Sequence, residues 1–154
     1  MSDHRETDMS ASDIDDFLSR HETGVLSLAR DDSPYAIPIS YGYDSTNQVL
    51  FMRLVSTPES EKRAFLSSTP DARVVVYEEG DETYASVVAN GLLERIELSE
   101  LTPETIEQYG ETRRPLFEIW AQGKADLDIE LYKLVPETLS GRTVTIDRDS
   151  EDSA

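Results

Sequence analysis

The chain has no cysteine and few lysines or histidines, and each shortage removes a class of chemistry. Its 154 residues include two histidines, His4 and His21, and three lysines, which are Lys62, Lys124 and Lys133. Without cysteine there are no disulfides, iron–sulfur clusters, thiolate zinc sites or thiol nucleophiles. Because the two histidines are not at ligand spacing, the sequence gives only weak support to a metal or haem site formed by histidine.

Long apolar runs are missing as well. No stretch approaches the roughly 20 apolar residues that a membrane helix needs, and the N-terminus lacks the apolar core of a signal peptide. We therefore expect a cytoplasmic protein without a membrane segment. The sequence also has no nucleophile-elbow pattern for a hydrolase and no glycine-rich dinucleotide fingerprint after a strand.

Acidic residues, by contrast, are abundant. The chain has 32 acidic and 14 basic residues, which gives a formal net charge of −18. Such a surface repels nucleic acids and anionic lipids, so neither is expected as a partner. Distributed acidity with little lysine favours a halophilic source, such as a haloarchaeon, where molar salt screens charges over about 3 Å. The alternative is an ordinary acidic protein from a mesophile.

The polar ends enclose one predicted domain. Residues 1–10 and 148–154 are polar and charged and are predicted to be disordered, which leaves a single domain over residues 11–147. At its start, Ser12 is expected to cap a helix, with Asp15 at the capping-box position. Gly24 is expected to end the chain's first helical segment.

Short β-type runs separated by turn residues dominate the rest of the chain. They predict six or seven mostly antiparallel strands in a mainly β barrel with three or four inserted helices. A bulge is expected at Asn90-Gly91, and a break near Pro136. The predicted strands cover residues 25–29, 33–43, 48–54, 72–77, 84–97, 129–135 and 138–146, and further helices follow Ser60 and Thr102 and span about 115–122.

The order of these pieces resembles the pyridoxamine 5′-phosphate oxidase-related family, the FMN-binding split barrel. The resemblance spans about residues 12–146. The segments that carry it are Gly24-Val25-Leu26-Ser27-Leu28-Ala29, Pro34 and Pro38, Leu50-Phe51-Met52-Arg53, Ser60-Glu61-Lys62, Leu66-Ser67-Ser68-Thr69-Pro70, Val74-Val75-Val76-Tyr77, Val87-Val88-Ala89-Asn90-Gly91 and Leu131-Tyr132-Lys133-Leu134-Val135-Pro136.

The resemblance implies a homodimer with two FMN sites at the subunit interface. It places the FMN phosphate against Arg53, Ser60 and Lys62, and a helix beginning near Ser60 would itself favour an anion. Relatives often have a basic residue where this chain has Glu61. The alternative for Lys62 is a surface lysine paired with a neighbouring glutamate.

The flavin ring is expected along Ile39, Ser40 and Tyr41, which would pair with its polar edge through backbone groups. From the partner subunit the resemblance implies Ser86, together with Trp120 or Arg142. A tryptophan on an apolar helical face more often packs in the core or at a dimer interface than against a flavin, and this is the alternative for Trp120. Arg142 follows Ser140-Gly141, where the pyridoxamine phosphate oxidases proper have an aromatic residue and a glutamine-glycine pair, so the resemblance does not support pyridoxal phosphate synthesis.

These features favour a small FMN-dependent oxidoreductase that takes reducing equivalents from NADH or NADPH and passes them to an unidentified acceptor. The cofactor performs the redox chemistry, so no catalytic side-chain motif is needed. Two alternatives stay open: a flavin-binding stress or redox-sensing protein without turnover, and the same barrel with a deazaflavin or haem.

Overall fold

A computed structural model describes residues 4–56, 71–96 and 128–146. These residues form eight strands and one helix. In chain order they are β1 (His4–Asp8), α1 (Ala11–Arg20), β2 (Thr23–Arg30), β3 (Ser33–Ser40), β4 (Gly42–Asp44), β5 (Val49–Ser56), β6 (Asp71–Glu79), β7 (Thr83–Arg95) and β8 (Asp128–Ile146). Within this part of the chain, no helix has the length and apolar character to cross a membrane.

All eight strands belong to one antiparallel sheet. The strand order is β3-β2-β6-β7-β8-β5-β4, and β1 pairs with β8. Strands β3 and β4 stand at opposite ends of this order, yet only Tyr41 separates them in the chain. The sheet must therefore curl until its two ends meet at Tyr41. We call this junction of β3 and β4 the seam. This curled, mainly β architecture confirms the predicted fold class, with eight strands among the described residues and not six or seven.

The core lies on the inner face of the curled sheet. Strands contribute alternate side chains to it, as a half-buried sheet requires. Helix α1 lies against this face through Ile14, Phe17 and Leu18, which are buried. The fully buried strand residues are Leu26, Leu50, Met52, Leu54, Val74, Val76, Val87 and Leu134, together with Tyr41 at the seam.

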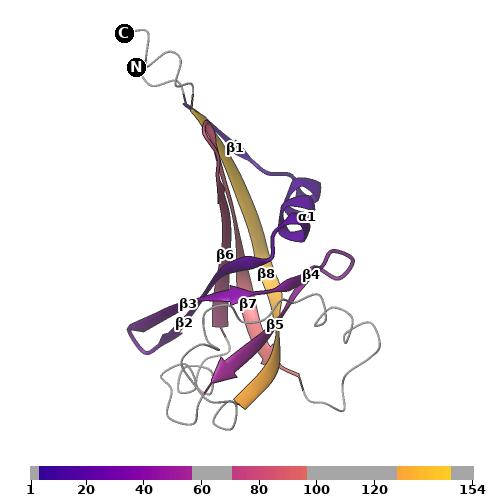
Figure 1. The fold of residues 1–154 in the computed structure, drawn as a ribbon, viewed down its shortest axis with the longest axis vertical. Coiled ribbons are helices and arrows are strands. Elements are labelled where there is room, and N and C mark those ends of the chain that lie inside the picture. Colours follow the sequence, from indigo (N-terminus) through magenta and orange to yellow (C-terminus); the bar gives the residue numbers. More distant parts are fainter. Residues whose placement is uncertain (1–3, 57–70, 97–127, 147–154) are drawn as a thin grey trace.

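Strands β7 and β8 are the longest in the sheet, and Figure 1 shows them running side by side with β6 toward β1. Their register shifts at Asn90/Gly91, which confirms the predicted bulge. Asn90 pairs with Thr138 and Gly91 with Pro136, so Glu137 is the extra residue. A Cβ atom at Gly91 would overlap the carbonyl oxygen of Val135, so only glycine fits there.

The bulge also explains why Pro136 does not break the strand. Residues 129–135 and 138–146 were predicted as two strands, but β8 is continuous. Strand β5 pairs with β8 only as far as Leu134. Pro136 therefore lies beyond the last β5 partner and beside the bulge, where a missing N–H costs little. The predicted strand 33–43 is instead divided at Tyr41 into β3 and β4.

The start of the chain differs from the prediction. Residues 4–8 were expected in a disordered tail but form β1, because the C-terminal half of β8 offers them a strand edge. The helix cap is Ser10 with Asp13 as its capping-box partner, and not Ser12 with Asp15. The Met9 N–H donates to the Gly141 carbonyl at 2.9 Å, which fixes the chain just before the cap. The predicted helices after Ser60, after Thr102 and over 115–122 lie outside the described residues, as does the tail 148–154.

Candidate functional site

A row of side chains crosses four strands on the outer face of the sheet. Arg142 on β8 pairs with Asp8 on β1 at one side and with Ser86 on β7 at the other. Ser86 in turn pairs with Tyr77 on β6. Directly opposed residues share a face of the sheet, with Cβ atoms about 4.5–5.5 Å apart. Two residues that the resemblance implied, Ser86 and Arg142, are therefore neighbours in the structure.

Asp8, Ser86 and Arg142 of this row line a shallow pocket of about 290 Å³, which we call the outer pocket. The Arg142 guanidinium is held beside it by an ion pair, with 2.7 Å between Nη1 and Oε1 of Glu6 on β1. Both side chains stay accessible, at 59% for Arg142 and 51% for Glu6. The lining residues are Asp8, Ser86, Val88, Ser140, Gly141 and Arg142. The pocket thus offers hydroxyls, charges of both signs and a small apolar surface.

A second cluster of predicted residues lies at the seam of the sheet. Gly42 on β4 pairs with Phe51 on β5, and β3, which ends at Ser40, also contacts β5, the strand that carries Arg53. Arg53 is half-buried and its Nε atom is enclosed. A half-buried guanidinium is well suited to charge-assisted hydrogen bonds with a phosphate. The seam therefore combines the positive charge of Arg53 with the end of β3, which stands at one end of the sheet order.

The segment Ile39–Tyr41 presents its backbone more readily than its side chains. Ile39 and Tyr41 are buried in the core. The Tyr41 N–H donates to the Glu22 carbonyl, toward β2, so in an extended strand the N–H of Ser40 points toward the outer edge of β3. Among the described strands, β3 stands at one end of the sheet order.

The two tyrosines at the seam are structural. The Tyr41 hydroxyl donates to the Leu18 carbonyl at 2.7 Å, and the Tyr43 hydroxyl donates to Oδ1 of Asp15 at 2.5 Å. Burial raises the pKa of Tyr41, with a smaller contribution from the charge of Glu22. Burial also raises the pKa of Tyr43, followed by its hydrogen bond to Asp15. Both hydroxyls therefore stay protonated and fasten α1 to the sheet.

The seam and the outer pocket are far apart in one chain. Arg53 pairs with Leu131 and Ser86 with Arg142, and these partners are eleven residues apart along β8. A strand rises about 3.3 Å per residue, so the separation along β8 is roughly 35 Å. The structure thus makes Ser86 and Arg142 cross-strand neighbours and places Ser40 and Arg53 on two contacting strands, β3 and β5. Eleven residues of β8 separate Leu131, the partner of Arg53, from Arg142.

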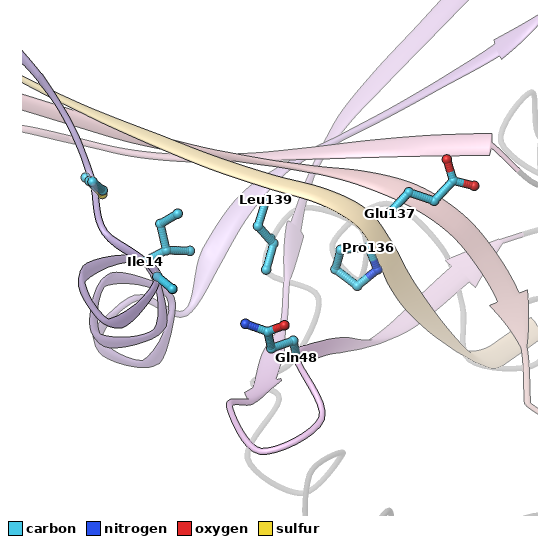
Figure 2. Close-up of a pocket in the computed structure, with 7 residues that line it drawn as sticks. Ile14, Gln48, Pro136, Glu137 and Leu139 are labelled. Atoms are coloured by element: carbon cyan, nitrogen blue, oxygen red, sulfur yellow. The ribbon is translucent and has the colours of Figure 1, made fainter.

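A second cavity, of about 350 Å³, opens on the inner side between α1, the β4–β5 turn and the bulge of β8. Figure 2 shows the Gln48 amide near Leu139 and Pro136, whereas the Glu137 carboxylate points away from these residues. The lining residues are Met9, Ala11, Ile14, Gln48, Pro136, Glu137 and Leu139. None of the residues implied by the resemblance lies here.

Three predicted cofactor residues, Ser60, Lys62 and Trp120, lie outside the described residues. Conversely, the sequence did not identify four residues of the outer pocket or its rim as site residues. These are Glu6, Asp8, Tyr77 and Ser140. Only the pairing of β1 with β8 brings Glu6 and Asp8 to Arg142, and no local pattern in the sequence signals it. Among residues 4–56, 71–96 and 128–146, no three histidine or acidic side chains gather as a metal site.

Comparisons with known proteins agree on the fold. Residues 10–143 match the family model described as pyridoxamine 5′-phosphate oxidase. No curated protein sequence matches this chain. Among solved structures, a FAD-binding protein from Mesorhizobium loti is similar with a TM-score of 0.69 and 24% identity, covering 90% of this chain and 97% of its own.

Two mycobacterial structures show the same fold. A FAD-binding protein from Mycobacterium smegmatis has a TM-score of 0.65 and 15% identity, covering 92% of this chain and 100% of its own. A heme-binding protein from the same organism has a TM-score of 0.62 and 17% identity, covering 85% of this chain and 53% of its own. FAD-binding proteins and a heme-binding protein therefore share this split-barrel fold.

Proposed function

Since the chain belongs to the pyridoxamine 5′-phosphate oxidase family, we propose that it is an FMN-dependent oxidoreductase. It works as a homodimer with two cofactor sites at the subunit interface, takes reducing equivalents from NADH or NADPH, and passes them to an acceptor. Bound FMN supplies the redox chemistry. The residues of the chain hold and orient it and limit the access of water.

The separation between the seam and the outer pocket carries this proposal. A single FMN is shorter than the roughly 35 Å that eleven residues of β8 span. Arg53 and Arg142 thus lie toward opposite ends of β8, and we infer that each FMN takes Arg53 from one chain and Arg142 from the other, with the two chains packed through their outer faces. Val25, Val75 and Val88 form one cross-strand row on that face, and Leu92 is partly exposed nearby. These apolar side chains support a protein partner there.

Each group of residues has a separate task in this arrangement. At the seam, Arg53 meets the phosphate charge together with Ser60 and Lys62, and the backbone at Ile39, Ser40 and Tyr41 pairs with the polar edge of the ring. From the other subunit, Ser86 and Arg142 supply hydrogen-bond donors near the ring, and Trp120 packs at the interface. No side chain is asked to form a covalent bond.

FMN titration followed by absorbance near about 450 nm tests the cofactor. Lys62→Ala and Arg53→Ala should each weaken binding by about 1–3 kcal/mol, the scale of a hydrogen bond to a charged group. Arg30→Ala removes the same charge from an exposed position at the end of β2 and should leave the affinity unchanged. A sample that takes up no FMN would overturn the proposal.

A mixing experiment tests the composite site. In a heterodimer of Arg53→Ala and Arg142→Ala chains, one interface site carries both substitutions and the other carries neither. Mixing the two variants should therefore restore FMN binding of wild-type affinity to about one quarter of all sites, because half of the dimers are mixed. Sites formed within one chain would show no restoration on mixing, and that result would exclude the interface arrangement.

A flavin-binding stress or redox-sensing protein without turnover is the second candidate. The heme-binding neighbour raises a third, the same barrel with another cofactor. Oxidation of NADH or NADPH by the FMN-loaded protein under air separates an enzyme from a redox sensor. The absorption spectrum of the native protein separates a flavin from a deazaflavin or haem. Within the described residues, His21 already contacts the Phe17 carbonyl through Nδ1 and lies 3.7 Å from Glu78, which disfavours it as an axial haem ligand.

The net charge of −18 supports a cytosol of high salt as the working environment. Thermal unfolding at low and at molar KCl tests this. The midpoint should rise with salt as repulsion among the acidic residues is screened, and a midpoint that ignores salt would contradict a halophilic origin.

A further inference from the structure

Arg142 stands between two acidic residues of β1. Glu6 forms the 2.7 Å ion pair with Nη1 of Arg142, and Asp8 is its direct cross-strand partner and lines the pocket. The three side chains together carry one net negative charge. A phosphate or carboxylate entering the pocket would compete with Glu6 for the guanidinium and would be repelled by Asp8. The pocket is therefore poorly suited to an anion, although it contains an arginine.

The remaining groups around the pocket suit a flat, positively charged ring. Ser86 and Ser140 bring hydroxyls to the pocket and Val88 brings an apolar surface. Tyr77 lies beside Ser86 on the neighbouring strand and is 60% exposed, the largest exposure among the large hydrophobic side chains of the described residues. An aromatic face attracts a cation through its quadrupole, so Tyr77 and Asp8 favour the same ligand charge from opposite sides of Arg142.

We infer that the pocket between β1, β7 and β8 binds a planar organic cation, and that Glu6 and Asp8 determine this selectivity. The inference rests on the proposed function in one respect, because it takes the ligand of this pocket to be the substrate that reacts with the flavin. That substrate then carries its positive charge on the part that enters the pocket. Arg142 keeps its other guanidinium N–H groups for neutral acceptors such as ring carbonyls, while Glu6 holds it in place.

Calorimetric titration of the full-length protein with two size-matched probes tests the inference. The cation 1-methylnicotinamide should bind more tightly than the anion nicotinate, at the lowest KCl concentration at which every variant stays folded. Glu6→Gln and Asp8→Asn should each weaken cation binding by about fivefold and strengthen anion binding by about fivefold, the effect on each probe of one unit charge at about 4 Å in water, so the ratio of cation to anion affinity should fall by about 25-fold. Asp32→Asn changes the net charge equally in the exposed β2–β3 turn and should leave the ratio unchanged.

A further substitution separates the aromatic contribution from the acidic one. Tyr77→Leu keeps an apolar side chain but removes the ring, and should weaken binding of 1-methylnicotinamide by about twofold to fivefold. Binding of nicotinate should not change. Because Tyr77 is largely exposed, this variant should fold normally.

The inference is overturned if nicotinate binds as tightly as 1-methylnicotinamide, if neither probe binds, or if the affinity ratio is the same in Glu6→Gln, Asp8→Asn and Asp32→Asn. FMN titration of the same samples distinguishes this failure from that of the proposed function. Normal FMN binding without cation selectivity removes the inference alone. Cation selectivity in a protein that takes up no FMN supports the pocket and removes the flavin assignment.

Discussion

The two halves of β8 lie in different environments. In the N-terminal half, Tyr132 and Leu134 are buried in the core, and the strand lies between β5 and β7. In the C-terminal half, β1 replaces β5, and Ser140 and Arg142 are exposed beside the outer pocket. The same strand therefore supplies stability at one end and polar recognition groups at the other, which lets residues near the pocket change without loss of the core.

The sharpest test of this division is a core truncation compared with an exposed one on the same strand. Leu134→Ala should lower the free energy of unfolding by about 2–5 kcal/mol, because it leaves a cavity at a fully buried position. Thr145→Ala, at an exposed position in the other half, should cost less than about 0.5 kcal/mol. Urea unfolding measures both. Equal losses would contradict the division.

The seam tyrosine comes next in size. Tyr41→Phe removes the donor to the buried Leu18 carbonyl and should cost about 1–3 kcal/mol. Tyr77→Phe removes a hydroxyl from an exposed side chain and serves as the control, with less than about 0.5 kcal/mol expected. The same unfolding measurements apply. If both substitutions cost the same, Tyr41 does not fasten the helix to the sheet.

High pH should lower the free energy of unfolding through the buried tyrosine at the seam. The ordinary pKa of a tyrosine is about 10, and burial raises the pKa of Tyr41 in the folded state, with the charge of Glu22 adding to the effect. Above pH about 10 the unfolded chain therefore binds fewer protons than the folded one, so stability falls as pH rises further. Unfolding followed from pH 8 to pH 11 should show a smaller decline in Tyr41→Phe than in the wild type.

The smallest effect on stability is expected at the outer pocket. Glu6→Gln breaks the ion pair with Arg142, yet both side chains are more than half exposed. An ion pair of this kind contributes up to about 1 kcal/mol and is screened by salt. The free energy of unfolding should therefore change by less than that amount, and a loss as large as that of Leu134→Ala would show that the pocket is part of the stabilising core.

Much of the sheet could be predicted from local patterns. The β-branched runs and the Asn90-Gly91 pair indicated the strands and the bulge, because glycine alone fits beside the Val135 carbonyl. The helix cap could not be chosen locally, since Ser10 with Asp13 and Ser12 with Asp15 have the same spacing. The contact of Met9 with Gly141, made by segments at opposite ends of the chain, selects the first pair.

The candidate site was predictable only in part and for a similar reason. The resemblance pointed to Ser86 and Arg142, and the structure makes them cross-strand neighbours. It also brings β3, which ends at Ser40, into contact with β5, which carries Arg53. Glu6 and Asp8 looked like ordinary tail residues, because nothing in a polar N-terminal segment reveals which strand edge it will meet. Their role depends on a pairing that spans almost the whole chain.

That pairing sets an order of events during synthesis. His4 pairs with Ile146, so β1 leaves the ribosome about 140 residues before its partner. At roughly 5–20 residues per second, β1 waits about 7 to 28 seconds for β8. Contacts this distant in sequence also form slowly once both strands exist. We therefore expect the pairing of β1 with β8, and with it the contact of Glu6 with Arg142, to form among the last events of synthesis.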